Sequence, residues 1–274
     1  MSTIPEVGPR SHGSFSQRVA VVVGGGSGIG RAVAKGLARQ GANIVVADFD
    51  GPRMDRTVED VLRLGTSEAA IALSTDVQSD ASVRSLARDS IKSMGRVDLV
   101  INAAGVLLQG KLEKISAADW TWMLETNLLG AVRTSMAFLP HMTERGSGHI
   151  VNVVSYGGLV PSDPLSVPYD TGHAALAVFT EGLARQLLGT GVRASIFCPG
   201  SKGPRVGQNT RSRGVGRLFS GPDRGPDSSQ QLEQLASTLI EGLHRSRFLI
   251  IGDPADAPAL AGRWDQIDAK QVSR

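Results

Sequence analysis

The chain has 274 residues, of which 41% are hydrophobic and 20% are charged, a composition typical of a globular domain with one large core. The formal net charge is +3, but residues 201–227 hold six cations and two anions, so the rest of the chain is close to neutral. Positive charge confined to one segment does not form the broad basic face of a nucleic-acid-binding protein. No apolar run reaches the ~18 residues that a membrane span needs. We therefore expect neither nucleic acid nor a membrane as a partner.

The amino-terminal sequence and the cysteine content both indicate the compartment. Residues 1–17 lack the apolar core of a signal peptide, so we expect a flexible leader on a cytoplasmic protein. The single cysteine, Cys198, excludes an internal disulfide and fits a reducing environment. Because Cys198 follows the apolar run VRASIF, we interpret it as a buried structural thiol and not as a nucleophile.

From residue 18 to residue 252, short β-branched runs alternate with longer helical patterns. The predicted strands are 18–24, 43–48, 69–76, 97–102, 149–155, 192–197 and 247–252, and the predicted helices are 29–40, 52–64, 80–94, 116–138, 169–188 and 229–245. The strands are continuously apolar, which indicates burial on both faces. We predict a single α/β domain over 18–252 with a doubly wound, seven-stranded parallel sheet of Rossmann type, followed by a tail at 253–274.

The segment 201–227 interrupts this pattern with six glycines, three prolines and no periodicity. It follows the carboxyl end of a predicted strand, where open α/β sheets bind their ligands. Two interpretations stay open, a lid over a substrate and a mobile surface insertion. Its arginines would meet an anionic group in the first case and would be solvated in the second.

A glycine-rich turn, GGGSGIG at residues 24–30, lies between the first predicted strand and helix. Such a turn lets the backbone approach a pyrophosphate, whose charge is favoured by the helix N-terminus. Asp48 ends the second predicted strand, where a carboxylate accepts from both ribose hydroxyls of NAD and repels the 2′-phosphate of NADP. Arg31 beside the turn favours NADP instead, because a cation there can contact a phosphate. On balance the sequence favours NAD.

These motifs resemble the short-chain dehydrogenase/reductase family, over residues 17 to 200 and more weakly to 265. The cofactor turn of that family, G-x-x-x-G-x-G, is matched by Gly24, Gly28 and Gly30 with Ile29. The resemblance implies a nicotinamide dinucleotide as cofactor. The other residues that it implies in the cofactor site are Ser27, Asp48, Asp76, Val77, Asn102, Ala103, Gly105, Pro199 and Gly200, and it implies no metal site.

The same resemblance implies the catalytic residues. A serine after the fifth strand, Ser155, would steady the substrate oxygen, and Tyr169 would exchange a proton with it. Asn127 matches a helix asparagine that holds a water near the catalytic centre. The family's helix reads Tyr-x-x-x-Lys, but this chain has His173 in place of the lysine.

The histidine changes the expected chemistry. Tyr169 and His173 are four residues apart, so their side chains share one face of a helix. At neutral pH an unperturbed histidine is mostly uncharged, and a tyrosine with a pKa of ~10 is about one part in a thousand ionised. Alcohol oxidation needs the tyrosinate as a base, whereas carbonyl reduction needs the neutral phenol as an acid. We therefore expect oxidation to be impaired more than reduction.

Three functions stay open at this point. The first, which we favour, is an NAD(H)-dependent oxidoreductase that acts as a ketoreductase on a small, largely apolar substrate. The second is non-redox proton transfer by Tyr169 and His173, as in dehydration, epimerisation or cyclisation. The third is a catalytically silent nucleotide-binding protein, because fold alone does not fix function. Residues 106–115 and 156–168 would line the substrate pocket, and the resemblance implies a homodimer or homotetramer.

Overall fold

The computed structural model describes residues 15–160, 163–200, 210–215 and 226–260. Its main sheet has seven parallel strands in the order β3-β2-β1-β4-β6-β7-β9, which confirms the predicted doubly wound fold. The strands are β1 (Val19–Val23), β2 (Asn43–Asp48), β3 (Ala70–Ser74), β4 (Leu99–Asn102), β6 (Gly148–Val153), β7 (Val192–Cys198) and β9 (Leu249–Ile251).

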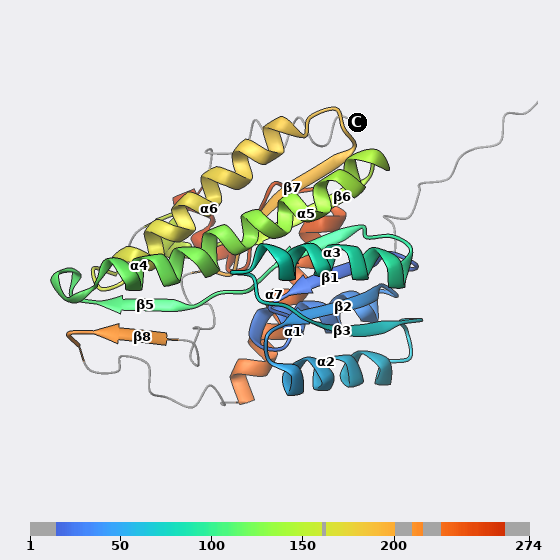
Figure 1. Ribbon diagram of the computed structural model, residues 1–274, viewed down its shortest axis with the longest axis horizontal. Helices are drawn as coiled ribbons and strands as arrows, with labels where there is room; N and C mark the ends of the chain where they lie inside the picture. Colours follow the sequence, from blue (N-terminus) through green and yellow to red (C-terminus); the bar gives the residue numbers. More distant parts are fainter. Residues whose placement is uncertain (1–14, 161–162, 201–209, 216–225, 261–274) are drawn as a thin grey trace, which may run out of the picture.

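Helices cover both faces of the sheet (Figure 1). Alternate residues of β1 show the two layers, because Val19, Val21 and Val23 belong to one buried cluster and Ala20 and Val22 to another. The first cluster includes residues of α3 (Asp80–Met94), α5 (Gly130–Glu144) and α6 (Val167–Gln186), and the second includes residues of α1 (Gly28–Arg39), α2 (Gly51–Arg63) and α7 (Pro226–His244). Burial on both sides explains why the strands read as unbroken apolar runs.

The predicted helix 116–138 is three segments in the structure. They are α4 (Ala117–Leu124), a π-helical turn η2 (Glu125–Leu129) and α5, which continues to Glu144. A π-helical turn inside a helix widens the backbone hydrogen-bonding pattern and often marks a functional site. Asn127, one of the predicted catalytic residues, lies in this turn.

A second sheet of two parallel strands lies beside the main one and projects at the left of Figure 1. β5 (Leu107–Gly110) pairs with β8 (Thr210–Arg213) in the register Leu107↔Thr210 to Gly110↔Arg213. The prediction that 201–227 lacks regular structure is therefore wrong for β8 and for the first residues of α7. The sequence TRSR has no apolar alternation, so only hydrogen bonds to β5 define it as a strand. The rest of 201–227 lies outside the described residues.

Two arginines of this segment are bound to α4 and are not freely solvated, which corrects one of the two interpretations above. The Arg213 guanidinium donates to both carboxylate oxygens of Asp119, over 2.6 and 3.0 Å. Asp119 also forms a capping box with Ser116 at the start of α4. The hydrogen bond from Arg213, above all, lowers the pKa of Asp119 to about 2. The Arg211 guanidinium lies 3.7 Å from the ring centroid of Trp122, a cation–π contact.

The boundaries of the domain differ in detail from the expectation. Phe15, placed in the predicted leader, is buried and packs against His244 at 4.8 Å between ring centroids. Residues 1–14 and 261–274 lie outside the described residues. Cys198 is fully buried, as predicted, and burial raises the pKa of its thiol to about 12. None of the described helices is both long enough and apolar enough to cross a bilayer.

Candidate active site

The glycine turn between β1 and α1 is closed on one side and open on the other. Gly24 has φ +80°, and a Cβ added there would lie 2.6 Å from the backbone nitrogen of Ala104. A Cβ on Gly30 would meet the Gly24 carbonyl, so α1 packs directly on the turn. Ser27, the N-cap of α1, and Gly28 are exposed, and the Ser27 side chain makes no capping bond. The amino end of α1 is thus open to an anion.

Asp48 is held at the end of β2 by backbone N–H groups alone. Its Oδ2 accepts from Gly26 over 3.0 Å, and its Oδ1 accepts from Phe49 over 2.8 Å. The cation nearest in sequence to the turn, Arg31, donates to Asp60 over 2.6 Å instead. The carboxylate of Asp48 therefore has no salt-bridge partner within the described ranges, and negative charge remains beside the turn.

The predicted adenine and nicotinamide contacts lie around the same crevice. Asp76 is exposed and Val77 is buried against Gly130 at the start of α5. Ala103 donates its backbone N–H to the Val23 carbonyl over 2.8 Å. This bond places residues 102–105, the NAAG stretch that ends at Gly105, beside the glycine turn.

The side chain of Asn102 turns away from the crevice. It is buried within the sheet, where its Nδ2 donates to Oδ1 of Asn152 over 2.8 Å. Asn152 in turn donates to Thr180 on α6 over 2.8 Å. Any contact of Asn102 with a cofactor would therefore be made by its backbone.

Asn127 is buried, and its amide is used twice on one neighbour. Its Oδ1 accepts from the Val106 N–H and its Nδ2 donates to the Val106 carbonyl, both over 2.8 Å. These bonds fix the start of β5 rather than expose the amide to the catalytic centre. The side-chain amide of Asn127 is therefore fully engaged within the protein.

Ser155 and Tyr169 are brought together by the turn η3 (Tyr156–Gly158) and the first turn of α6. The Ser155 side chain lies close enough to the Tyr169 phenol to favour its ionised form. Burial has the larger effect and raises the pKa of Tyr169 to about 12. The tyrosine is thus a neutral phenol over the whole physiological range, as the sequence indicates.

His173 lies one turn along α6 from Tyr169, as predicted, and the two rings meet edge to face at 4.4 Å. The ring is buried, and its Nδ1 accepts from the backbone N–H of Ser155 over 3.2 Å. Burial alone lowers the pKa of His173 to about 4. His173 is therefore an uncharged side chain at neutral pH.

Pro199 and Gly200 follow β7 and pack against the segment after β9. A Cβ on Gly200 would lie 2.8 Å from Cβ of Asp253, and one on Gly252 would lie 2.5 Å from the Pro199 carbonyl. Gly200 has φ +109°, a conformation that favours glycine. Close packing therefore fixes the conformation of the two residues that follow the carboxyl end of β7.

The region between β5 and α6 is more polar than the sequence suggested. Leu107, Leu108 and Leu159, which we expected to line a pocket, are buried in the core. Gln109, also buried, donates to Ser166 over 2.9 Å.

Asp170, next to Tyr169, is another buried polar residue that the sequence reasoning missed. Burial, and then the charge of Asp163, raises its pKa to about 6. Its position beside Tyr169 in YDTGH was the only signal in the sequence that could have pointed to it.

The match to known proteins shows the family of the chain. Residues 18–213 match the family model described as short chain dehydrogenase. The chain belongs to the short-chain dehydrogenase family. It is an oxidoreductase of that family, which confirms the resemblance found in the sequence.

Similar proteins cover most of the chain. An uncharacterized oxidoreductase of Staphylococcus epidermidis is 32% identical over 184 residues, which are 67% of this chain and 77% of the relative. The structure of a short chain dehydrogenase/reductase from Burkholderia phymatum in complex with NAD has a TM-score of 0.74 and 28% identity, and the match covers 94% of this chain and 97% of that one. Actinorhodin polyketide ketoreductase with NADPH has a TM-score of 0.65 and 30% identity, over 69% and 71% of the two chains.

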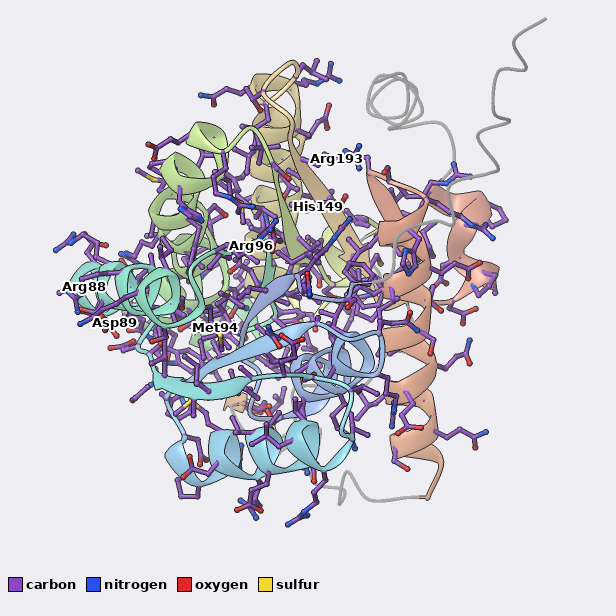
Figure 2. All side chains as sticks on the ribbon, turned by 90° about the vertical axis from the view of Figure 1, so that its right-hand side faces the viewer. Arg88, Asp89, Met94, Arg96, His149 and Arg193 are labelled. Atoms are coloured by element: carbon purple, nitrogen blue, oxygen red, sulfur yellow. The ribbon has the colours of Figure 1, made fainter. Side chains whose placement is uncertain are left out.

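The buried histidines of this short-chain dehydrogenase predict an acid-sensitive fold. Burial lowers the pKa of His173 to about 4 and that of His149 to about 3, whereas an unfolded histidine titrates near 6.5. His149 lies where the strands begin, the end that faces the viewer in Figure 2. As the pH falls below 6.5 the unfolded state binds protons that the folded state refuses, so stability is lost. Asp170 acts in the opposite direction between pH 6 and 4, because its folded pKa is raised.

Urea unfolding at several pH values between 6 and 4.5 tests this balance. Relative to the wild type, His173→Asn should make the loss of unfolding free energy shallower by about 1.4 kcal/mol per pH unit, and Asp170→Asn should make it steeper by about the same amount. Equal slopes in all three proteins would contradict the assignment of these groups.

Proposed function

We propose that this protein is an NADH-dependent carbonyl reductase in which Tyr169 donates a proton to the carbonyl oxygen of a small substrate. The observation that carries the proposal is the arrangement of Ser155 and Tyr169, which both contact His173, together with burial that raises the pKa of the phenol to about 12. A phenol that stays protonated is suited to be the acid in reduction. Ser155 would hold the carbonyl oxygen in place by donating a second hydrogen bond to it.

The glycine turn supports the binding of a nicotinamide dinucleotide. A Cβ at Gly24 or Gly30 would fill the turn, and the amino end of α1 above it is open, as a pyrophosphate requires. When bound, the dinucleotide supplies the hydride, and the products are the alcohol and the oxidised cofactor. The residues proposed to hold it are Gly24, Ser27, Gly28, Ile29, Gly30, Asp48, Asp76, Val77, Ala103, Gly105, Pro199, Gly200 and the backbone of Asn102.

The charge beside the turn supports NAD over NADP. Asp48 carries a negative charge next to Gly26, and the nearby cations Arg31 and Arg53 are engaged with Asp60 and Asp50. A 2′-phosphate would meet the carboxylate of Asp48 at close range, and such a like-charge contact is unfavourable. The neighbours of known structure include one with NAD and one with NADPH, so the preference rests on Asp48.

The non-redox alternative loses its main support. It requires His173 to exchange protons near neutral pH, but burial lowers the pKa of this side chain to about 4. An imidazole that is neutral from pH 5 upward is a poor proton shuttle at pH 7. No observation specifically favours the alternative of a catalytically silent protein. Ser155 and Tyr169 lie close together, as an active enzyme requires.

Two helices that cover one face of the sheet support self-association. Met136 on α5 and Val178 on α6 are 66% and 60% exposed, although both are apolar. Figure 1 shows α5 and α6 on the same face of the molecule. We propose that a second copy of the chain covers them in a homodimer or homotetramer.

Replacement of the proposed acid should abolish reduction. Tyr169→Phe should lower kcat for a panel of ketones by about 100-fold or more, since one proton-transfer group contributes about 10²–10⁴, while NADH binding measured by fluorescence stays unchanged. Tyr156→Phe is the matched control, because Tyr156 is the other tyrosine of the chain and packs against the core. A Tyr169→Phe protein with normal turnover would overturn the proposed acid.

Neutralisation of Asp48 should relax the choice of cofactor. Asp48→Asn keeps an acceptor for the Gly26 N–H but removes the charge, so the ratio of the NADPH and NADH dissociation constants should fall by about tenfold, the equivalent of 1.4 kcal/mol. Asp55→Asn, which removes a charge from the exposed side of α2, should leave the ratio unchanged. If both variants gave the wild-type ratio, Asp48 would not set the cofactor preference.

A charged pair of residues on α5 and α6 should break up the oligomer. The double variant Met136→Lys, Val178→Lys should sediment as a monomer, because burying two unpaired ammonium groups is strongly unfavourable. Leu62→Lys is the control, since Leu62 is 48% exposed on α2, which covers the opposite face. An unchanged sedimentation coefficient in the double variant would place the interface elsewhere.

A further inference from the structure

The contact between His173 and Ser155 defines the protonation state of the histidine ring. The backbone N–H of Ser155 lies 3.2 Å from Nδ1. A backbone amide can only donate, so Nδ1 must carry a lone pair and not a proton. An imidazolium, with protons on both nitrogens, could not accept this bond. The geometry therefore fixes a neutral ring with its single proton on Nε2.

The Nε2–H group that results has nothing to donate to. His173 is 6% exposed, and within the described part of the chain Nε2 has no hydrogen-bond partner. Buried donors in folded proteins are almost always paired, and an unpaired one at an active site points to a group that arrives with a ligand. The ring of Tyr169, the proposed acid, lies against the imidazole at 4.4 Å, so that ligand would also be near the reacting atoms.

We propose that His173 is a neutral positioning residue with two separate contacts. Nδ1 holds the backbone of Ser155, which keeps the Ser155 hydroxyl beside Tyr169, and Nε2–H donates to an uncharged oxygen atom of the bound cofactor or substrate. The inference rests on the proposed carbonyl reduction. It assigns the two nitrogens of one ring to two different tasks, support of the catalytic serine and binding of a ligand.

The turn η3 packs directly against α6 at His173. A Cβ on Gly158 would lie 2.5 Å from Cβ of His173, so the turn η3 presses directly on this part of α6. Gly157 is in the same close contact with the carboxylate of Asp170. The two glycines that follow Tyr156 thus let the Ser155 turn approach α6 closely enough for the bond to Nδ1.

The environment also explains why an uncharged oxygen is the expected acceptor. The aromatic side chain in contact with the ring is Tyr169, whose phenol is neutral at pH 7. Burial, and no charged neighbour, accounts for the lowered pKa of His173. A neutral N–H in such a place binds a hydroxyl or carbonyl oxygen without the cost of burying an ion. A lysine at this position could not make the same contact, because an ammonium group cannot accept the Ser155 N–H.

The tautomer can be measured directly on the unliganded protein. The chain has five histidines, and long-range ¹H–¹⁵N correlation spectra distinguish the Nε2–H tautomer, the Nδ1–H tautomer and the imidazolium. The signals that disappear in His173→Asn belong to His173. We expect the neutral Nε2–H form at pH 7. A Nδ1–H tautomer or a charged ring would overturn the proposal, whatever the activity of the protein.

Two variants separate the two contacts. In His173→Asn the amide oxygen occupies the position of Nδ1, so kcat should stay within about threefold of the wild type while ligand affinity falls by up to about tenfold. In His173→Gln the amide reaches the position of Nε2, so affinity should be kept while kcat falls by up to about tenfold. His173→Leu should lose both. If Asn and Gln changed kcat and affinity alike, the histidine would have a merely structural role.

Binding measurements on His173→Asn identify the oxygen that accepts from Nε2–H. The two quantities to compare are the dissociation constant for NADH and the KM for the ketone. A weaker dissociation constant for NADH alone would assign the oxygen to the cofactor, and an unchanged one with a raised KM for the ketone would assign it to the substrate. If neither constant moved, the Nε2–H contact would be refuted. Wild-type protein that binds no dinucleotide would instead refute the proposed function, and the tautomer measurement would still decide the contact with Ser155.

Discussion

The burial of the parallel sheet on both faces is the constraint on which the site depends. Every strand of the main sheet runs in the same direction, and helices on both sides remove its side chains from water. The faces are therefore closed to ligands, and the chain offers functional groups only where strands end and turns begin. Gly24, Asp48, Ala103, Ser155 and Pro199 all follow or end strands of this sheet, so parallel strand direction alone gathers them at one edge.

Close backbone contacts then set the geometry at that edge. Gly24 and Gly30 let α1 start directly above β1, and Gly157 and Gly158 let the turn after β6 press on α6. At each place a side chain would force two segments apart. The first contact leaves an amino end of a helix open to an anion, and the second brings the Ser155 N–H to the imidazole of His173.

Two side chains of the proposed catalytic site, Tyr169 and His173, are uncharged at neutral pH. Burial raises the pKa of Tyr169 to about 12 and lowers that of His173 to about 4, so both side chains are neutral at pH 7. Without a cation the phenol remains an acid, which suits the transfer of a proton to a carbonyl oxygen. Fixed dipoles, rather than a charge, would then orient the substrate, and these dipoles are held by hydrogen bonds within the protein.

The second sheet shows how segments that are distant in the chain support the proposed active site. β5 is held at its start by Asn127 and joins β8, and the arginines of β8 are bound to α4 by Asp119 and Trp122. The contacts join β5, which follows the NAAG stretch, to β8 and α4. They give Arg211 and Arg213 a defined structural role.

The sequence by itself determined the seven strands of the main sheet, the glycine turn, Asp48 and the pairing of Tyr169 with a histidine one turn away. These features depend on local conformation and on the periodicity of burial, both of which can be read along the chain. Only the tertiary structure decided that TRSR is a strand, that Asn127 binds Val106, that Asp170 is buried and that Nδ1 of His173 accepts from Ser155. Each of these depends on partners many residues away or on exclusion from water. The local sequence pattern specifies neither the distance between two segments nor the burial of a particular polar side chain.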